Sequence, residues 1–185
     1  MDSMPLRPVD SLHYPGRTYK FFNGSTVYPF GYGLSYTSFN YKLTSKNVPI
    51  SIKLNRLHHC RNLNYINKTS EEPCPAVVVD DLTCDNEIAF EVEVQNVGDR
   101  DGSEVVMVYS KPPEGIAGTH IKQVIGFERV SVAAKKSEKV KFALNVCKSL
   151  RIVDNKGYSL LPSGVHKILL GTSSESIEVN VSFVR

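Results

Sequence analysis

The stretch NEIAFEVEVQNVG, residues 86–98, decides the fold because apolar and polar side chains alternate along it with a period of two. Its apolar positions are Ile88, Phe90, Val92 and Val94, and glutamate stands at three of the positions around them. Successive side chains of a β-strand point to opposite faces of the sheet. The pattern therefore predicts a strand with one buried face and one solvated face.

Six further runs of this kind lie on either side of that stretch, each bounded by glycine, proline, asparagine or serine. They are TSFNYKL (37–43), SEVVMVYS (103–110), IKQVIGFERVSV (121–132), EKVKFALNV (138–146), GVHKILLG (164–171) and SIEVNVSFV (176–184). No convincing amphipathic helix interrupts them. Seven short strands with regularly spaced turns predict an all-β protein, an immunoglobulin-like antiparallel β-sandwich. The chain has no tryptophan and so lacks the Cys-Trp-Cys core of antibody domains, which favours the fibronectin type III-like kind of sandwich.

The chain of 185 residues is long enough for one ordinary domain and an appendage. We expect the sandwich to occupy residues 37–185 and residues 1–36 to form an N-terminal extension. The extension begins without the basic and apolar segments of a signal peptide, and we interpret it as cut from a longer protein. Residues 47–85 show little periodicity and are interpreted as a long insertion between the first and second strands. Such connections are typically functional or tethered by disulfides.

The composition indicates a soluble globular protein, with 41% hydrophobic and 22% charged residues. The net charge of +3 is small and the basic residues are scattered, which argues against a nucleic-acid partner. No apolar run approaches the length of a membrane-spanning helix, so we expect no membrane partner.

The four cysteines are Cys60, Cys74, Cys84 and Cys147, and their spacing fits neither CxxC pairs nor a zinc finger. Cys60, Cys74 and Cys84 lie close together in residues 47–85, where one disulfide would staple a loop. The four residues allow three complete pairings, and the sequence leaves the choice open. A metal site at Cys60 with its neighbours His58 and His59 is disfavoured, because adjacent strand residues do not converge on one ion.

Three Asn-x-Ser/Thr sequons, at Asn23, Asn67 and Asn180, are candidates for glycosylation. Their number is close to what chance gives for this composition. Together with the cysteines they favour an oxidising compartment.

The sequence contains no recognisable catalytic constellation. Ser35 lacks the glycine that a nucleophile elbow requires two residues later, and GYG at residues 31–33 lacks the third glycine of a nucleotide loop. The paired aspartates at residues 80–81 and 99–101 are typical of solvated turns. We therefore predict no catalytic residue, no metal site and no cofactor.

Five blocks of the sequence together resemble, in order, the carboxy-terminal end of glycoside hydrolase family three enzymes. They are YPGRTYKFF (14–22), YPFGYGLSYTSF (28–39), VEVQNVGDRDGSEVVMVYSKPP (92–113), IKQVIGFERVSVAAKKSEKVKFAL (121–144) and LLPSGVHKILLGTSS (160–174). The resemblance is greatest to the plant cell-wall β-xylosidases, some of which also act on α-arabinofuranosides. It implies that residues 37–185 form the family's fibronectin type III-like domain. Residues 1–36 would then be the tail end of the preceding α/β sandwich domain, with GRTY as its last strand, followed by an aromatic linker.

The resemblance places catalysis outside this chain. Retaining glycosidases use two carboxyl groups, a nucleophile and an acid/base. In the family, the nucleophilic aspartate belongs to an amino-terminal barrel and the acid/base glutamate to the α/β sandwich domain. No residue here matches either motif, so we expect the chain alone to be inactive. The family also implies secretion to the plant cell wall.

The stretch YPFGYGLSYTSF concentrates aromatic rings and chain-bending residues in a way that solvated loops do not. We expect it to form an interdomain seam that packs the sandwich against the catalytic barrel and the α/β sandwich domain. The seam residues are Tyr28, Pro29, Phe30, Gly31, Tyr32, Gly33, Tyr36 and Phe39. The alternative is that these rings close the core of the sandwich itself.

The sequence is compatible with three functions. The first is a non-catalytic accessory domain of a secreted β-xylosidase that acts in xylan catabolism. The second is a carbohydrate-binding module for xylan-type polysaccharide, with its rings at Tyr14, Tyr19, Phe21, Phe22 and Tyr28, although Tyr19 and Phe21 also fit one face of a strand. The third, a stand-alone interaction domain, is disfavoured because it would leave the N-terminal rings uncovered.

Overall fold

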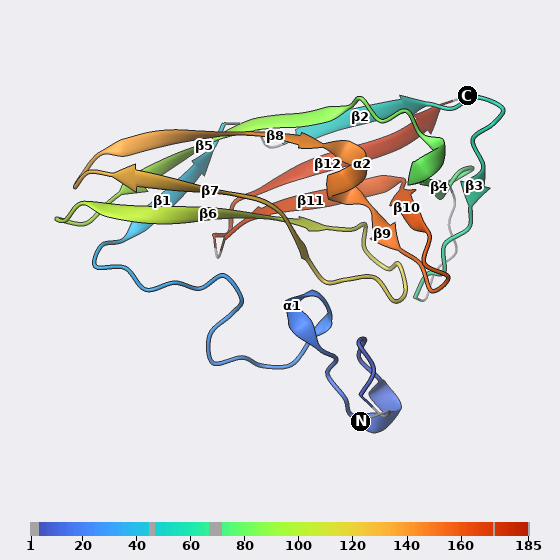
Figure 1. Ribbon diagram of the computed structural model, residues 1–185, viewed down its shortest axis with the longest axis horizontal. Coiled ribbons are helices and arrows are strands. Elements are labelled where there is room, and N and C mark those ends of the chain that lie inside the picture. Colours follow the sequence, from blue (N-terminus) through green and yellow to red (C-terminus); the bar gives the residue numbers. More distant parts are fainter. Residues whose placement is uncertain (1–3, 45–46, 67–71, 172, 185) are drawn as a thin grey trace.

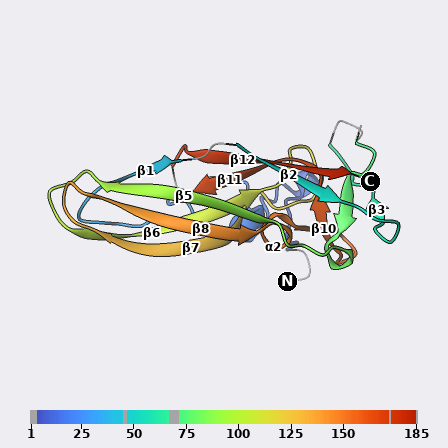
Figure 2. The same ribbon diagram turned by 90° about the horizontal axis from the view of Figure 1, so that it is seen from above.

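A computed structural model describes residues 4–44, 47–66, 72–171 and 173–184, with backbone only at Asn47. These residues form an elongated β-sandwich, and the N-terminal segment lies along one outer side of it (Figure 1). Figure 2 shows that the long strands run along the same axis and that the short strands gather at the end that carries the C-terminus. The predicted all-β sandwich of fibronectin type III-like kind is confirmed.

Two sheets make up the sandwich. The three-stranded sheet has the order β1 (Phe39–Leu43), β5 (Glu87–Asn96), β8 (Ser137–Asn145), all antiparallel. The five-stranded sheet has the order β2 (Asn47–Lys53), β12 (Ser176–Val184), β11 (Gly164–Leu170), β6 (Gly102–Lys111), β7 (Gln123–Val132). Its pairs are antiparallel except β2 with β12, which is parallel.

A small third sheet caps one end, in the order β3 (Cys60–Arg61), β4 (Ala76–Val78), β10 (Ser159–Pro162), β9 (Ile152–Val153). The helices are short: α1 (Thr18–Phe21), α2 (Val146–Leu150) and the 3₁₀ turns Asp10–Leu12 and Val79–Asp81. All seven strands predicted from the sequence are present.

The core lies between the two large sheets, as the alternating pattern predicts. Ile88, Phe90, Val92 and Val94 are all buried, and the stacked rings of Phe90 and Phe142 join β5 to β8 with centroids 5.2 Å apart. From the opposite sheet the inward residues include Val106, Val108, Ile168, Leu170, Ile177, Val179 and Val181. Burial of such side chains contributes about 1.5 to 3 kcal/mol each, so this interface is the main source of stability.

Residues 47–85 are not the single insertion that we expected. Ile50 and Ile52 alternate with polar residues, and both are buried in the main core, so β2 is a fifth strand of the large sheet. Pro49 is tolerated because β2 lies at the edge of the sheet. The rest of the segment contributes β3 and β4 to the small sheet.

The expectation that GRTY forms a strand is also wrong for this chain. Residues 18–21 form one helical turn, with the Phe22 amide donating to the Thr18 carbonyl at 2.9 Å. A strand needs a neighbouring strand for its backbone hydrogen bonds, whereas a helical turn satisfies them locally. Tyr19 and Phe21 therefore do not share a strand face.

One disulfide lies within the region of the small sheet, and the other joins α2 to the residues before β5. Cys60 pairs with Cys74 across a 14-residue separation, within the segment where a loop staple was expected. Cys84 pairs with Cys147, 63 residues away in α2, so it takes no part in the loop staple expected among Cys60, Cys74 and Cys84. The sequence could not indicate this partner because nothing along the chain shows that α2 folds back beside residue 84.

Two histidines are buried at the end of the main core. His166 on β11 is fully buried, and its Nε2 lies 3.0 Å from the Pro162 carbonyl oxygen, while its Nδ1 has no partner in the described residues. Burial lowers the pKa of His166 to about 4. The pKa of His120 is also lowered to about 4, first by burial and then by the positive charge of Lys20 and by His166.

Removing the long-range disulfide should destabilise the chain more than removing the short one. A cross-link restricts the unfolded chain, so the free energy of unfolding lost on its removal grows with the length of the closed loop. We expect a loss of about 4 kcal/mol for the double variant Cys84→Ala and Cys147→Ala, and of about 3 kcal/mol for Cys60→Ala and Cys74→Ala. Urea unfolding of the two double variants measures this difference. A larger loss for the Cys60 and Cys74 variant would contradict the loop-length argument.

The free energy of unfolding should fall as the pH drops from 6.5 towards 4. In this window His120 and His166 take up protons in the unfolded chain but stay neutral in the folded chain. Each therefore adds up to about 1.4 kcal/mol per pH unit to the slope of the free energy of unfolding against pH. Denaturant unfolding at several pH values measures the slope. His120→Gln should reduce it, because the variant lacks one of the two buried imidazoles. An unchanged slope in His120→Gln would show that the buried histidine is not the cause.

Candidate functional site

The most prominent surface feature is the segment that connects α1 to β1, which runs along the outer face of the five-stranded sheet (Figure 1). The Phe30 ring stacks on the Tyr19 ring of α1 with centroids 4.0 Å apart and planes 11° apart. Phe30 also meets the Tyr109 ring of β6 edge to face, with centroids 6.3 Å apart. Two aromatic contacts thus hold the segment, one within the extension and one to the sandwich.

Tyr109 is the anchor of this contact. It points out of the sandwich yet is 0% exposed, because residues 30–31 cover it. Its hydroxyl donates to the Phe30 carbonyl oxygen at 3.3 Å, and the Lys122 ammonium lies 4.4 Å from its ring centroid. Burial raises the pKa of Tyr109 and lowers that of Lys122.

Gly31 makes the close approach possible. Its φ of 87° lies in the left-handed region, and a Cβ at this position would collide with the Tyr109 hydroxyl. Gly33, in contrast, has no atom within 4 Å of the place where a Cβ would stand. The two glycines of the GYG motif therefore have different roles, and only the first is required by packing.

The far end of the segment is fastened by a buried amide. The Thr37 hydroxyl donates to Asn96 Oδ1 at 2.5 Å, and the same oxygen accepts from the Gly98 amide at 3.1 Å. The Asn96 Nδ2 donates to the carbonyl oxygens of Arg100 and Val132 at 2.8 and 3.0 Å. A fully buried side chain that satisfies this many groups fixes where the extension joins the sandwich.

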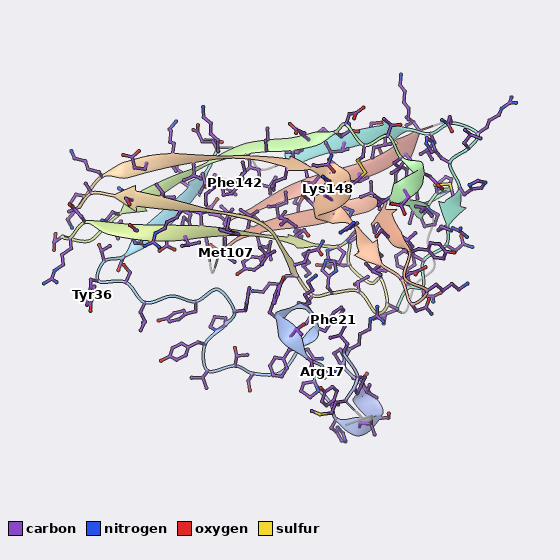
Figure 3. The ribbon with its side chains drawn as sticks, in the orientation of Figure 1. Arg17, Phe21, Tyr36, Met107, Phe142 and Lys148 are labelled. Atoms are coloured by element: carbon purple, nitrogen blue, oxygen red, sulfur yellow. A yellow bond between two sulfur atoms is a disulfide. The ribbon has the colours of Figure 1, made fainter. Side chains whose placement is uncertain are left out.

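Between these anchors most of the rings are open to solvent. Tyr36 is 94% exposed, Tyr28 is 66% exposed, and Tyr28 stacks on Tyr32 with centroids 5.0 Å apart. We define the aromatic surface as Tyr28, Phe30, Tyr32, Leu34, Tyr36, Met107 and Phe127. Met107 faces the segment from β6, and Figure 3 shows Tyr36 at the margin of the molecule, away from the core residue Phe142.

Several residues of the aromatic surface adjoin one another instead of standing singly. Phe127 lies opposite Met107 in the β6–β7 ladder and continues the apolar area across the outer face of the sheet. Contiguous apolar area of this kind marks contacts with other protein surfaces. It also rules out, for Tyr28, Tyr32 and Tyr36, the alternative that they close the core of the sandwich.

Phe39 is the seam residue that the structure places elsewhere. It lies on β1, half-buried against the main core, because strand pairing with β5 turns its side chain inward. Three residues that the sequence analysis did not include belong to the site: Met107, Tyr109 and Phe127. A signal was available in SEVVMVYS, where both faces of the strand are apolar, a pattern that indicates a strand covered on both sides.

The rings proposed for sugar stacking are largely engaged within the chain. Tyr19 stacks on Phe30, and the Arg7 guanidinium carbon lies 5.6 Å from the Phe21 ring centroid. Both rings, like Tyr14 and Phe22, are half-buried. Of the five, only Tyr28 is exposed, so they do not form a continuous platform.

The two described sequons are accessible. Asn23 is exposed in the loop after α1, and Asn180 is exposed on the outward side of β12. Asn67 lies outside the described residues.

The carboxylates considered for chemistry take part in local interactions. Asp99 forms an ion pair with Lys135 at 2.9 Å, and Asp101 accepts a hydrogen bond from the Ala134 amide at 2.8 Å. Asp81 lies 3.9 Å from His59 Nδ1. Within the described residues there is no cluster of three or more His, Cys, Asp or Glu side chains fit to hold a metal ion. The helices of the same residues include none long and apolar enough to cross a membrane.

Comparison with known proteins identifies the class of the sandwich. Residues 104–174 match the fibronectin type III-like domain family. The chain is 34% identical to beta-D-xylosidase 3 of Arabidopsis thaliana and 32% identical to beta-xylosidase/alpha-L-arabinofuranosidase 1 of Medicago sativa subsp. varia, and both matches cover 98% of the chain. It spans only 23% and 22% of these relatives.

Solved structures agree on the fold. A GH3 exo-β-xylosidase in complex with a xylobiose aziridine probe matches with a TM-score of 0.72 and 23% identity, over 97% of this chain and 22% of the enzyme. A β-glucosidase from Listeria innocua matches with a TM-score of 0.59 over 86% of the chain. The chain thus contains a fibronectin type III-like domain. Over nearly its whole length it is similar to the carboxy-terminal part of plant β-xylosidases of glycoside hydrolase family three.

Gly31→Ala should detach the aromatic segment from β6. The added methyl group meets the Tyr109 hydroxyl and the backbone must hold a left-handed conformation, which together cost about 1 to 3 kcal/mol. Chymotrypsin should then cut the segment faster, and thermal unfolding should begin earlier. Gly33→Ala is the matched control, because open space surrounds that position. Equal cleavage rates for the two variants would show that the Gly31 contact does not hold the segment.

Proposed function

We propose that this chain is a non-catalytic accessory domain of a secreted β-xylosidase that acts in the breakdown of cell-wall xylan. It packs against the catalytic domains of that enzyme through the aromatic surface and stabilises them. The observation that carries the proposal is an exposed, anchored row of rings in a chain that spans less than a quarter of its relatives.

The arrangement suits a docking surface better than a flexible linker. The segment is fixed at one end by the Phe30–Tyr109 contact and at the other by the Thr37–Asn96 hydrogen bond. Rings between the anchors therefore lose little conformational freedom on binding, and each Tyr presents a large apolar face with a polar tip. Such residues are enriched among those that contribute most to protein interfaces.

The partners in this proposal are the catalytic barrel and the α/β sandwich domain that the family places before this region. The proposal leaves the nucleophile and the acid/base to those domains, since no residue of this chain matches either motif. It also includes glycosylation at Asn23 and Asn180, which are exposed.

Docking can be measured with the chain and the separately produced remainder of the longer enzyme. The chain should bind the remainder and raise its melting temperature, and Phe30→Ser with Tyr32→Ser should weaken binding at least about tenfold, since two interface rings are lost. Leu57→Ser is the control, because Leu57 is exposed on a loop outside the aromatic surface.

Activity gives the second readout. The chain alone should not hydrolyse nitrophenyl xyloside or arabinofuranoside, and the complex with the remainder should hydrolyse one or both. Unchanged binding and activity in the double Ser variant, with only a local loss of stability, would overturn the docking role. Turnover by the chain alone would overturn its assignment as non-catalytic.

A further inference from the structure

A groove of about 670 Å³ opens at the end of the sandwich that carries the small sheet, away from the aromatic surface. Three loops and the N-terminal extension line it: residues 61–64 after β3, residues 116–119 before β7, residues 152–158 around the β9–β10 turn, and Arg7. Its volume lies in the range of small-molecule sites, about 300 to 1,000 Å³.

The walls of the groove are held in place by hydrogen bonds. The Ile66 amide donates to the Gly115 carbonyl at 2.7 Å and the Ala117 amide donates to the Asn64 carbonyl at 2.8 Å, so the first two loops are joined. In the third loop, Asp154 Oδ1 accepts from the Lys156 and Tyr158 amides at 2.8 and 2.9 Å. A site with a fixed shape loses less entropy when it binds a ligand.

The groove combines an apolar floor with polar walls. Ile116, Ile152 and Leu160 are buried beneath it, in a small hydrophobic cluster that also contains Ala76 and Val78. Above them, the side chains of Asn62, Asn64 and Asn155 are exposed and lie along the lining. Tyr158 stands beside them with 49% of its surface exposed.

Positive charge dominates the lining. Arg7, Arg61 and Lys156 face a single carboxylate, Asp154, which already accepts two backbone hydrogen bonds. None of the three cations forms an ion pair with a carboxylate within the described part of the chain. The Arg61 guanidinium carbon lies 5.6 Å from the Tyr158 ring centroid, so a planar cation and an aromatic ring stand side by side.

We propose that this groove binds an acidic oligosaccharide, with Arg61 as the partner of a sugar carboxylate and Tyr158 as the ring against which a sugar lies. A guanidinium binds a carboxylate through two parallel hydrogen bonds. The exposed amides supply both donors and acceptors, which suits hydroxyl groups. The apolar floor and the aromatic ring suit the CH face of a pyranose.

This combination fits a saccharide better than other anions. A phosphate site would need converging backbone amides or cations, whereas here the cations are spread along a groove with a ring between them. An acidic peptide would pair its backbone with a long free strand edge, whereas β3 and β9 are only two residues long and most of the lining consists of loops. The inference concerns binding by this chain alone and does not depend on its docking to catalytic domains.

Calorimetry with the 185-residue chain tests the proposal. The probes are a xylo-oligosaccharide that bears one glucuronic acid, the neutral oligosaccharide of the same length, inorganic phosphate and a hexaglutamate peptide. We expect the acidic saccharide to bind at least about tenfold more tightly than the neutral one, and its binding to weaken when salt screens the charges.

Variants place the binding in the groove. Arg61→Gln should remove the preference for the acidic saccharide, and Tyr158→Ala should weaken both saccharides. Arg129→Gln and Tyr36→Ala replace the same residue types at exposed positions outside the groove and should bind like the parent chain. Thermal melts confirm that each variant is folded, and two-dimensional NMR shifts should map to residues 61–64 and 152–158.

The proposal is overturned if the acidic and neutral saccharides bind alike, or if neither binds. It is also overturned if phosphate or hexaglutamate binds as tightly as the acidic saccharide, or if Tyr36→Ala, rather than Tyr158→Ala, abolishes binding. Loss of docking in the double Ser variant would not alter these results, so the two proposals can fail separately.

Discussion

The burial of Tyr109 on the outward face of β6 is the contact on which the arrangement of the N-terminal extension depends. Its ring lies outside the core of the sandwich and is nevertheless fully covered, because Phe30 and Gly31 lie over it. Phe30 in turn supports Tyr19 and with it the helical turn α1. One aromatic residue of the sandwich thus orders a long N-terminal segment and holds its remaining rings towards solvent.

The same contact separates two functions of aromatic residues that the sequence shows as one dense group. Phe30 contacts both Tyr19 and Tyr109 and still leaves part of its ring exposed, whereas Tyr28, Tyr32 and Tyr36 make no ring contact with the described part of the sandwich. At the other end of the molecule Tyr158 stands in a charged groove, apart from this group. The aromatic surface and the groove therefore differ in chemistry, the first apolar and the second cationic, and they suit different partners.

The sequence predicted what alternation alone can encode. Alternate residues of β5 and β12, such as Ile88, Val94 and Val179, face the core because a period of two fixes the face of each residue. It could not predict that β2 pairs in parallel with a strand about 130 residues away, or that Cys84 meets Cys147, since such contacts depend on how distant segments fold together. The groove is likewise made of loops whose spacing along the chain carries no signal. At residues 18–21 the chain forms a helical turn because no strand of the described residues pairs with this segment.

The parallel pairing of β2 with β12 has a consequence for synthesis in the cell. β12 lies between β2 and β11, so the large sheet stays incomplete until β12, more than 120 residues after β2, has left the ribosome. Until then Ile50 and Ile52 have no permanent cover, and the unpaired edge of β11 is open to other chains. Such long-range pairing closes slowly compared with local contacts. Association through that edge therefore competes with folding until the last strand has entered the sheet.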